Sequence, residues 1–71
     1  MKSKLARIPD GKKFGFIKGV GKDEDYFFHQ DDFQDNWDDM ILDMRTMNVD
    51  LEFEVREGER GMRAYGVRRI K

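Results

Sequence analysis

Strict alternation of apolar and charged residues over 49–56 is the clearest structural pattern in the chain. Val49, Leu51, Phe53 and Val55 stand at every second position, with charged residues between them. Successive side chains of a strand point to opposite faces, so this pattern predicts a half-buried β-strand with these four side chains inward. Apolar and aromatic runs bounded by turn-forming residues predict four further strands, at residues 4–8, 14–20, 25–30 and 63–70.

The segment between the third and fourth predicted strands has a different period. Met40, Met44 and Met47 recur at intervals of four and three, which is typical of one face of a helix. We expect a short helix there, capped by Asp38 or Asp39. We interpret the Met residues as core packing, because thioethers fill irregular gaps.

Two aromatic runs, 14–17 and 26–29, carry the functional signal. In an extended chain Phe14 and Phe16 share one face with Lys12 and Lys18. In the second run alternate rings point to opposite sides, so only one pair can line a core. Exposed rings beside Lys suit a single-stranded nucleic acid, whose bases stack on rings while its phosphates lie near cations. Burial of both faces, as in a sandwich strand, is the alternative that spacing alone leaves open.

Charge is distributed unevenly, although the net charge is only −1. Residues 1–22 carry +6, residues 23–43 carry −9 and residues 44–71 carry +2. A solvated loop is the ordinary interpretation of such an acidic block, and repulsion of phosphates along one rim is a second. The spacing of the Asp residues does not fit a calcium-binding loop of the helix-loop-helix kind.

The chain has 71 residues and no Cys, so we expect one domain, residues 1–71, without disulfides or thiolate metal sites. No apolar run is long enough for a signal peptide or a membrane span, and we expect a soluble cytoplasmic protein without membrane contact. His29 has no Ser, Cys or second His in a catalytic pattern, and the Gly residues form no phosphate loop. We therefore expect no enzyme activity, no cofactor and no metal site.

Both aromatic runs resemble motifs of the cold-shock domain family. Residues 12–17 resemble the first ribonucleoprotein motif, usually Lys-Gly-Phe-Gly-Phe-Ile, with Lys13 where Gly is usual. Residues 25–29 resemble the second motif, and Gln30 replaces the Phe that usually follows the His.

Two later segments continue the resemblance in the same order. Residues 57–61 resemble the family's Glu-Gly-x-Lys/Arg-Gly turn, and residues 64–67 resemble its Ala-x-Asn-Val closing strand, with Gly66 in the Asn position. The stretch from His29 to Phe53 is longer than in the family pattern, which predicts an insertion in the acidic connection. Four linked motifs over nearly the whole chain are far more specific than any one of them.

The resemblance implies an all-β fold, a five-stranded antiparallel barrel of the oligonucleotide/oligosaccharide-binding (OB) type with a long acidic loop or short helix between strands three and four. It also implies that Ile17, Tyr26 and Phe28 face inward, while Phe14, Phe16, Phe27 and His29 face outward. A buried Tyr26 hydroxyl needs a hydrogen-bond partner or an opening to water.

A binding role carries over from the family to matching positions. Arg7 stands where the family has Trp, and its guanidinium can stack on a base. Trp37 lies near a loop aromatic that the family uses, or else covers the core. The predicted nucleic-acid-binding residues are Arg7, Lys12, Phe14, Phe16, Lys18, Phe27, His29, Trp37, Arg60 and Arg63.

The function that the resemblance implies is binding of single-stranded RNA or DNA with low sequence specificity, by a monomer. A stacking surface without an energy-using motif favours an RNA chaperone or a regulator of transcription or translation. The alternative is a small protein-interaction barrel whose aromatic face docks a partner protein. Arg7, Gln30 and the acidic insertion favour this alternative, because each departs from the binding pattern.

Overall fold

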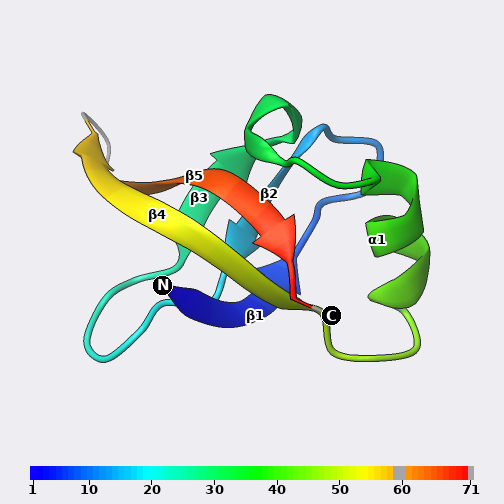
Figure 1. The fold of residues 1–71 in the computed structure, drawn as a ribbon, viewed down its shortest axis with the longest axis horizontal. Helices are drawn as coiled ribbons and strands as arrows, with labels where there is room; N and C mark the ends of the chain where they lie inside the picture. Colours follow the sequence, from blue (N-terminus) through cyan, green and yellow to red (C-terminus); the bar gives the residue numbers. More distant parts are fainter. Residues whose placement is uncertain (59–60, 71) are drawn as a thin grey trace.

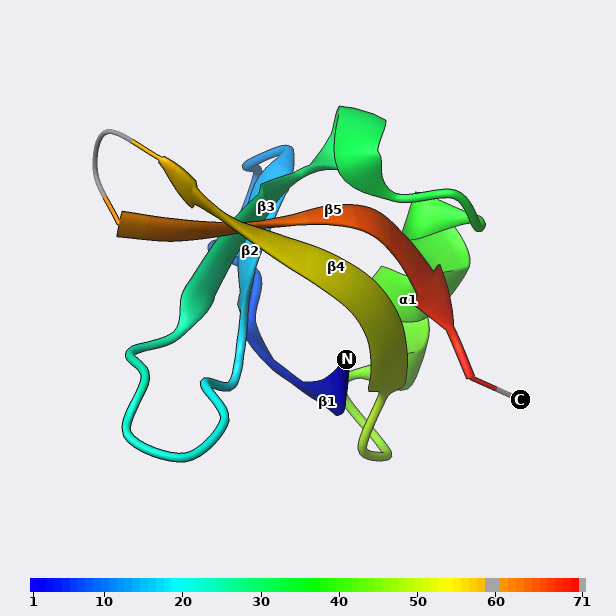
Figure 2. The same cartoon turned by 60° about the vertical axis from the view of Figure 1, so that its left-hand side comes forward.

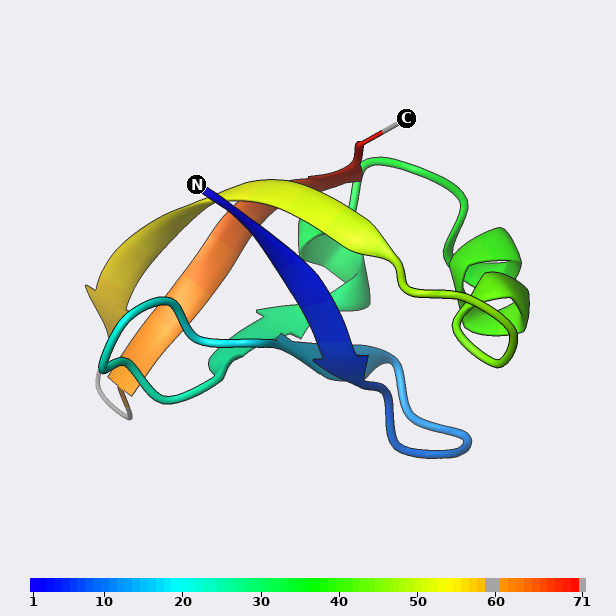
Figure 3. The ribbon, with the colours of Figure 1, turned by 90° about the horizontal axis from the view of Figure 1, so that it is seen from below.

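The computed structural model describes residues 1–58 and 61–70, which form a closed barrel of five strands (Figure 1). The strands follow one another around the barrel in the order β1-β2-β3-β5-β4. Seen from below, β1 runs between β4 and β2 and so closes the sheet (Figure 3). The predicted all-β barrel is confirmed. Its strands are β1 (Lys2–Arg7), β2 (Phe14–Ile17), β3 (Tyr26–His29), β4 (Asp50–Gly58) and β5 (Gly61–Arg69).

Strand direction departs from the purely antiparallel expectation at one pair. The pairs β1–β2, β1–β4, β2–β3 and β4–β5 are antiparallel, whereas β3 and β5 are parallel, with Phe27 opposite Arg63. Directions cannot alternate all the way round a closed ring with an odd number of strands, so one parallel pair is required. The long connection after β3 allows it, because β4 intervenes before the chain returns as β5.

The barrel interior holds the apolar side chains that the period-two patterns predicted. Ile17, Tyr26 and Phe28 are fully buried, as expected for their face of β2 and β3. On β4, the inward prediction holds for Leu51 and Phe53, and for Val49 just before the strand, whereas Val55 is only partly buried. The core consists of Ile8, Ile17, Tyr26, Phe28, Phe33, Trp37, Met40, Val49, Leu51, Phe53, Ala64 and Val67.

The hydroxyl of Tyr26 has the partners that its burial requires. It donates to Oδ2 of Asp23 at 2.7 Å and accepts from the backbone N–H of Val20 at 3.2 Å. Burial, together with the hydrogen bond to Asp23, raises the pKa of the Tyr26 hydroxyl above its ordinary value. The loop between β2 and β3 thus covers one end of the barrel and supplies the hydrogen-bond partners of the Tyr26 hydroxyl.

The connection from β3 to β4 holds a 3-10 turn, η1 (Gln30–Asp32), and the predicted short helix, α1 (Trp37–Asp43). The helix is capped by Asn36, whose Oδ1 accepts from the backbone N–H of Asp39 at 3.1 Å, so the expected cap at Asp38 or Asp39 was wrong. In all three ribbon views α1 lies at the opposite end of the molecule from the β2–β3 loop (Figures 1, 2 and 3). No helix among the described residues is long and apolar enough to cross a membrane.

The Met stripe packs inward as far as Met44, the C-cap of α1. Met40 is fully buried and Met44 partly buried, but Met47 lies beyond the end of α1 at Asp43 and is 56% exposed. The predicted core role is therefore correct for Met40 and Met44 and wrong for Met47, because the helical period ends before that residue.

Two of the glycines show different reasons for which glycine is needed. A Cβ at Gly15 would lie 2.8 Å from Cγ1 of Ile8 and 3.0 Å from the carbonyl oxygen of Arg7, so only Gly lets the chain approach so closely there. Gly66 has a φ of +58°, in the left-handed region that Gly adopts freely and Asn tolerates. This conformation explains why Gly can stand at the position where the resemblance expects Asn.

Candidate nucleic-acid interface

Three phenylalanine rings gather on the outer face of β2 and β3. The ring centroids are 6.0 Å apart for Phe14 and Phe16, 5.5 Å for Phe14 and Phe27, and 5.9 Å for Phe16 and Phe27. All three side chains are half-exposed, and Phe16 lies opposite Phe27 in the antiparallel pair. The structure thus confirms their outward orientation and brings them together; we call Phe14, Phe16 and Phe27 the aromatic surface.

Cations surround this surface from two sides. Arg7 of β1 lies opposite Phe16, and its Cζ is 4.7 Å from the centroid of that ring. Lys12 and Lys18 are exposed just before and just after β2. Arg7 therefore adds a flat guanidinium at the place where the resemblance expects Trp, and the two Lys residues leave positive charge at both ends of β2.

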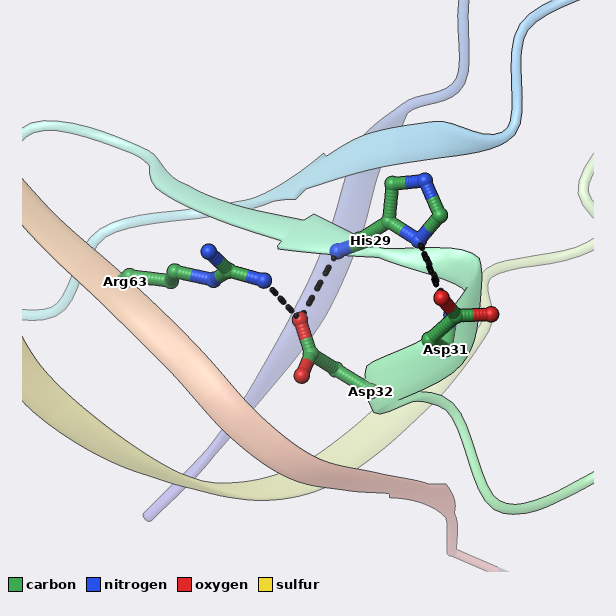
Figure 4. A network of polar contacts seen from close by, with 4 residues as sticks. All are labelled: His29, Asp31, Asp32 and Arg63. Atoms are coloured by element: carbon green, nitrogen blue, oxygen red, sulfur yellow. Dashed lines mark hydrogen bonds and ion pairs between the residues drawn. The ribbon is translucent and has the colours of Figure 1, made fainter.

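His29 and Arg63 are joined to each other through Asp32 (Figure 4). Oδ2 of Asp32 accepts from the Arg63 guanidinium at 2.9 Å and from the backbone N–H of His29 at 3.1 Å. The hydrogen bond to Asp32 raises the pKa of Arg63 above its ordinary value. The His29 ring points away from Arg63 (Figure 4), and its Nδ1 accepts from the backbone N–H of Asp31 at 3.1 Å. Both predicted site residues are therefore fixed by the first turn after β3.

Tyr65 also belongs to this outer face, and the sequence-based site prediction missed it. The Cζ of Arg63 lies 5.5 Å from the centroid of Phe27 and 5.1 Å from that of Tyr65. The signal was available, since residues two positions apart on a strand share a face and Arg63 was already among the predicted binding residues. What the sequence lacked was the register that sets β5 beside β3.

Two predicted residues do not join the site as described. Trp37 is only 7% exposed and packs with ring centroids 5.8 Å from Phe28 and 5.9 Å from Phe33. The structure places it in the core and not on the aromatic surface, because it opens α1 toward the core; this supports the alternative, a cover over the core. Arg60 lies outside the described residues.

The acidic block is largely occupied in holding the fold. Several of its carboxylates accept hydrogen bonds from a hydroxyl, from backbone N–H groups or from guanidinium groups; these are Asp23, Asp25, Asp32, Asp35 and Asp43. Within residues 1–58 and 61–70, no three His, Cys, Asp or Glu side chains gather in a way that could hold a metal ion. The block is thus more than a plain solvated loop, since its carboxylates fasten the connection to the barrel.

The family model of the 'Cold-shock' DNA-binding domain matches residues 1–70. The chain belongs to the cold-shock domain family. Cold-shock domains generally bind single-stranded DNA or RNA and form a non-enzymatic family. A search of curated proteins found no match to this cold-shock domain. The aromatic surface of the domain lies on the two segments that resemble the family's ribonucleoprotein motifs.

Proposed function

We propose that the protein binds single-stranded RNA or DNA on the aromatic surface, with low sequence specificity, and acts as an RNA chaperone. The observation that carries this proposal is the group of three half-exposed rings with centroids no more than 6.0 Å apart. Exposed rings so close together offer consecutive bases flat faces on which to stack. Arg7, Lys12 and Lys18 supply the charge that the phosphates of such a strand require.

The number of rings sets the expected affinity. Each stacked base contributes about 1–3 kcal/mol by alanine substitution, and three rings with the Arg7 guanidinium give several kcal/mol in total. Ordering the flexible strand offsets part of this gain. A dissociation constant near the micromolar range, about −8 kcal/mol, follows. Sequence preference is slight, because stacking uses a face that every base has.

The first test is a titration of a labelled pyrimidine-rich single strand by fluorescence anisotropy at two salt concentrations, with a duplex of the same sequence alongside. We expect single-strand binding that weakens with salt, because bound phosphates release counterions. Duplex should bind poorly, since its bases are already stacked on one another. Absence of single-strand binding at both salt concentrations would overturn the proposal.

Chaperone activity has its own test. A surface that holds unstacked bases stabilises the open form of an RNA hairpin by mass action, without an energy source. We expect the protein at saturation to lower the melting temperature of a fluorophore-labelled hairpin and to speed its opening. An unchanged melting curve at saturating protein would remove the chaperone role and leave simple binding. A monomeric protein in the cytoplasm, where RNA is accessible, is part of this proposal.

The second candidate function is a protein-interaction barrel, and one observation favours it. The exposed ring of Phe16 is already covered in part by Arg7, and Arg63 is already paired with Asp32, so both cations have intramolecular partners. The same titration separates the two candidates, because the first predicts strand binding that weakens steeply with salt, whereas the second predicts no strand binding at either salt concentration.

A further inference from the structure

A second flat surface lies on β5, next to the aromatic surface. Tyr65 and Arg63 stand two positions apart on β5 and are both half-exposed, so they share its outer face. Arg63 is the residue of β5 that pairs with Phe27 of β3. The outer faces of β3 and β5 therefore meet at this pair, and the ribbon views show β5 crossing β3 (Figures 1 and 2).

Guanidinium groups and rings alternate along this path. Arg63 lies between Phe27 and Tyr65, at 5.5 and 5.1 Å from their ring centroids. Arg56 of β4 continues the series, with its Cζ 5.4 Å from the centroid of Tyr65. Guanidinium planes accept stacked bases as aromatic rings do. A flat surface thus runs from β3 across β5 to β4.

A hollow of about 560 Å³ opens along this path. Phe16, Phe27, Met62, Arg63 and Tyr65 contribute to its lining. Small-molecule sites are commonly about 300–1,000 Å³ in volume and are lined mainly by apolar and aromatic side chains. A nucleobase, which is flat and largely apolar on its faces, suits such walls.

The two arginines offer different chemistry to a nucleotide. Arg63 is held by Asp32 at 2.9 Å, so its charge is compensated and its plane is fixed. The Arg56 side chain is 71% exposed and its ion pair with Glu54 is long, at 3.8 Å. Arg63 is therefore suited to stacking, and Arg56 to a phosphate.

We propose that Tyr65, with Arg56 and Arg63, forms a further nucleobase-stacking site that takes nucleotides beyond those on the aromatic surface. This inference rests on the proposed function and deepens it, because it sets the path and the length of the bound strand. A strand long enough to cross β5 gains a stacked base and a phosphate contact, and a shorter strand gains neither.

Strand length provides the test. Binding of a pyrimidine strand of about four nucleotides, the shortest site of an OB fold, is compared with that of one about twice as long. For Tyr65→Ala, we expect the long strand to bind between about fivefold and about 150-fold more weakly, and the short strand to bind unchanged. Tyr65→Phe is the matched control and should bind both strands like the wild type, because it keeps the ring.

The outcomes distinguish this inference from the function on which it rests. Two results would overturn the β5 site and leave the proposed function intact, provided that the wild type binds both strands. In one, Tyr65→Ala binds the long strand with wild-type affinity; in the other, its affinity for both strands falls by the same factor. Wild type that binds neither strand would overturn the proposed function itself. If Tyr65→Ala does not fold, NMR spectra of the wild type provide the test. The ring resonances of Tyr65 should shift on addition of the long strand and stay unchanged with the short strand, and resonances that do not move with the long strand would overturn the β5 site.

Discussion

Replacing Phe27 by Ala tests the aromatic surface at its centre. Its ring lies 5.5 Å from Phe14, 5.9 Å from Phe16 and 5.5 Å from the Arg63 guanidinium, so its removal takes away one stacking face and separates the other groups. One stacked base contributes about 1–3 kcal/mol, which corresponds to a dissociation constant roughly five to 150 times larger. We expect a loss in this range for single strands of RNA and DNA alike.

Stability should fall as well in this variant, by about 1–3 kcal/mol for its two ring contacts. Phe27 is half-exposed and lies outside the buried core, so the loss consists mainly of its aromatic contacts, each worth about 0.5–1.5 kcal/mol. In a domain of this size, 1 kcal/mol corresponds to a shift in Tm of about 4–8 °C. A thermal melt followed by circular dichroism therefore establishes the temperature at which the variant is folded, and binding is measured below it.

Fluorescence anisotropy with a pyrimidine-rich strand measures the effect, and Leu42→Ala is the matched control. Leu42 is a 63% exposed apolar residue of α1, away from the aromatic surface, and its replacement should leave the dissociation constant unchanged. A folded Phe27→Ala protein that binds like the wild type would refute the stacking argument. So would equal losses in Phe27→Ala and Leu42→Ala, because these would show a general effect of reduced apolar surface.

Three further changes test charge, core and pH. Lys12→Ala should flatten the dependence of log K on log salt by about 0.7 for each phosphate that Lys12 neutralises, and an unchanged slope would exclude Lys12 from the interface. Trp37→Phe should lower the free energy of unfolding by about 0.5–3 kcal/mol, measured in urea, without changing single-strand affinity; a selective loss of affinity would restore Trp37 to the interface. Tyr26→Phe should cost about 1–3 kcal/mol of stability, because it leaves the Val20 N–H without its partner. The folded-state pKa of Tyr26 is raised, so its contribution is complete below pH 10 and is lost as the pH rises from 10.0 through the folded value. Urea titrations on either side of that pH should show that the difference in free energy of unfolding between wild type and Tyr26→Phe decreases as the pH rises. A constant difference would contradict the role given to the Tyr26 hydroxyl.

The fold was accessible from the sequence wherever local pattern and burial agree. Val49, Leu51 and Phe53 alternate without interruption, and their inward direction follows from the geometry of a strand alone. The outward direction of Phe14, Phe16 and Phe27 needed the resemblance as well, because alternation separates two faces without saying which one meets the core. The site prediction was limited in the same way. Periodicity places Phe14 and Phe16 on one face of a strand, but it does not show that Phe27 of the neighbouring strand lies next to both.

Residues whose environment depends on distant segments were predicted less well. Trp37 was placed in the interface from its neighbourhood in the chain, but its ring meets Phe28 of β3, which only the folded connection brings near. The helix limits were missed for a different, local reason. Asn36 caps α1 and Met47 lies beyond its end, because a cap depends on the local dihedral angles and not on the period of apolar residues.

By itself the sequence predicted the strands and separated the two faces of β2 and β3, because these depend on the two-residue period of an extended chain. Its resemblance to the cold-shock domain family indicated which rings face outward. Tertiary structure alone decided that Arg63 stands opposite Phe27, that Asp32 holds it there and that Tyr65 continues the surface. The physical reason is barrel closure. The register between β3 and β5 is set by how the whole ring of strands fits together, and no local pattern in either strand encodes it.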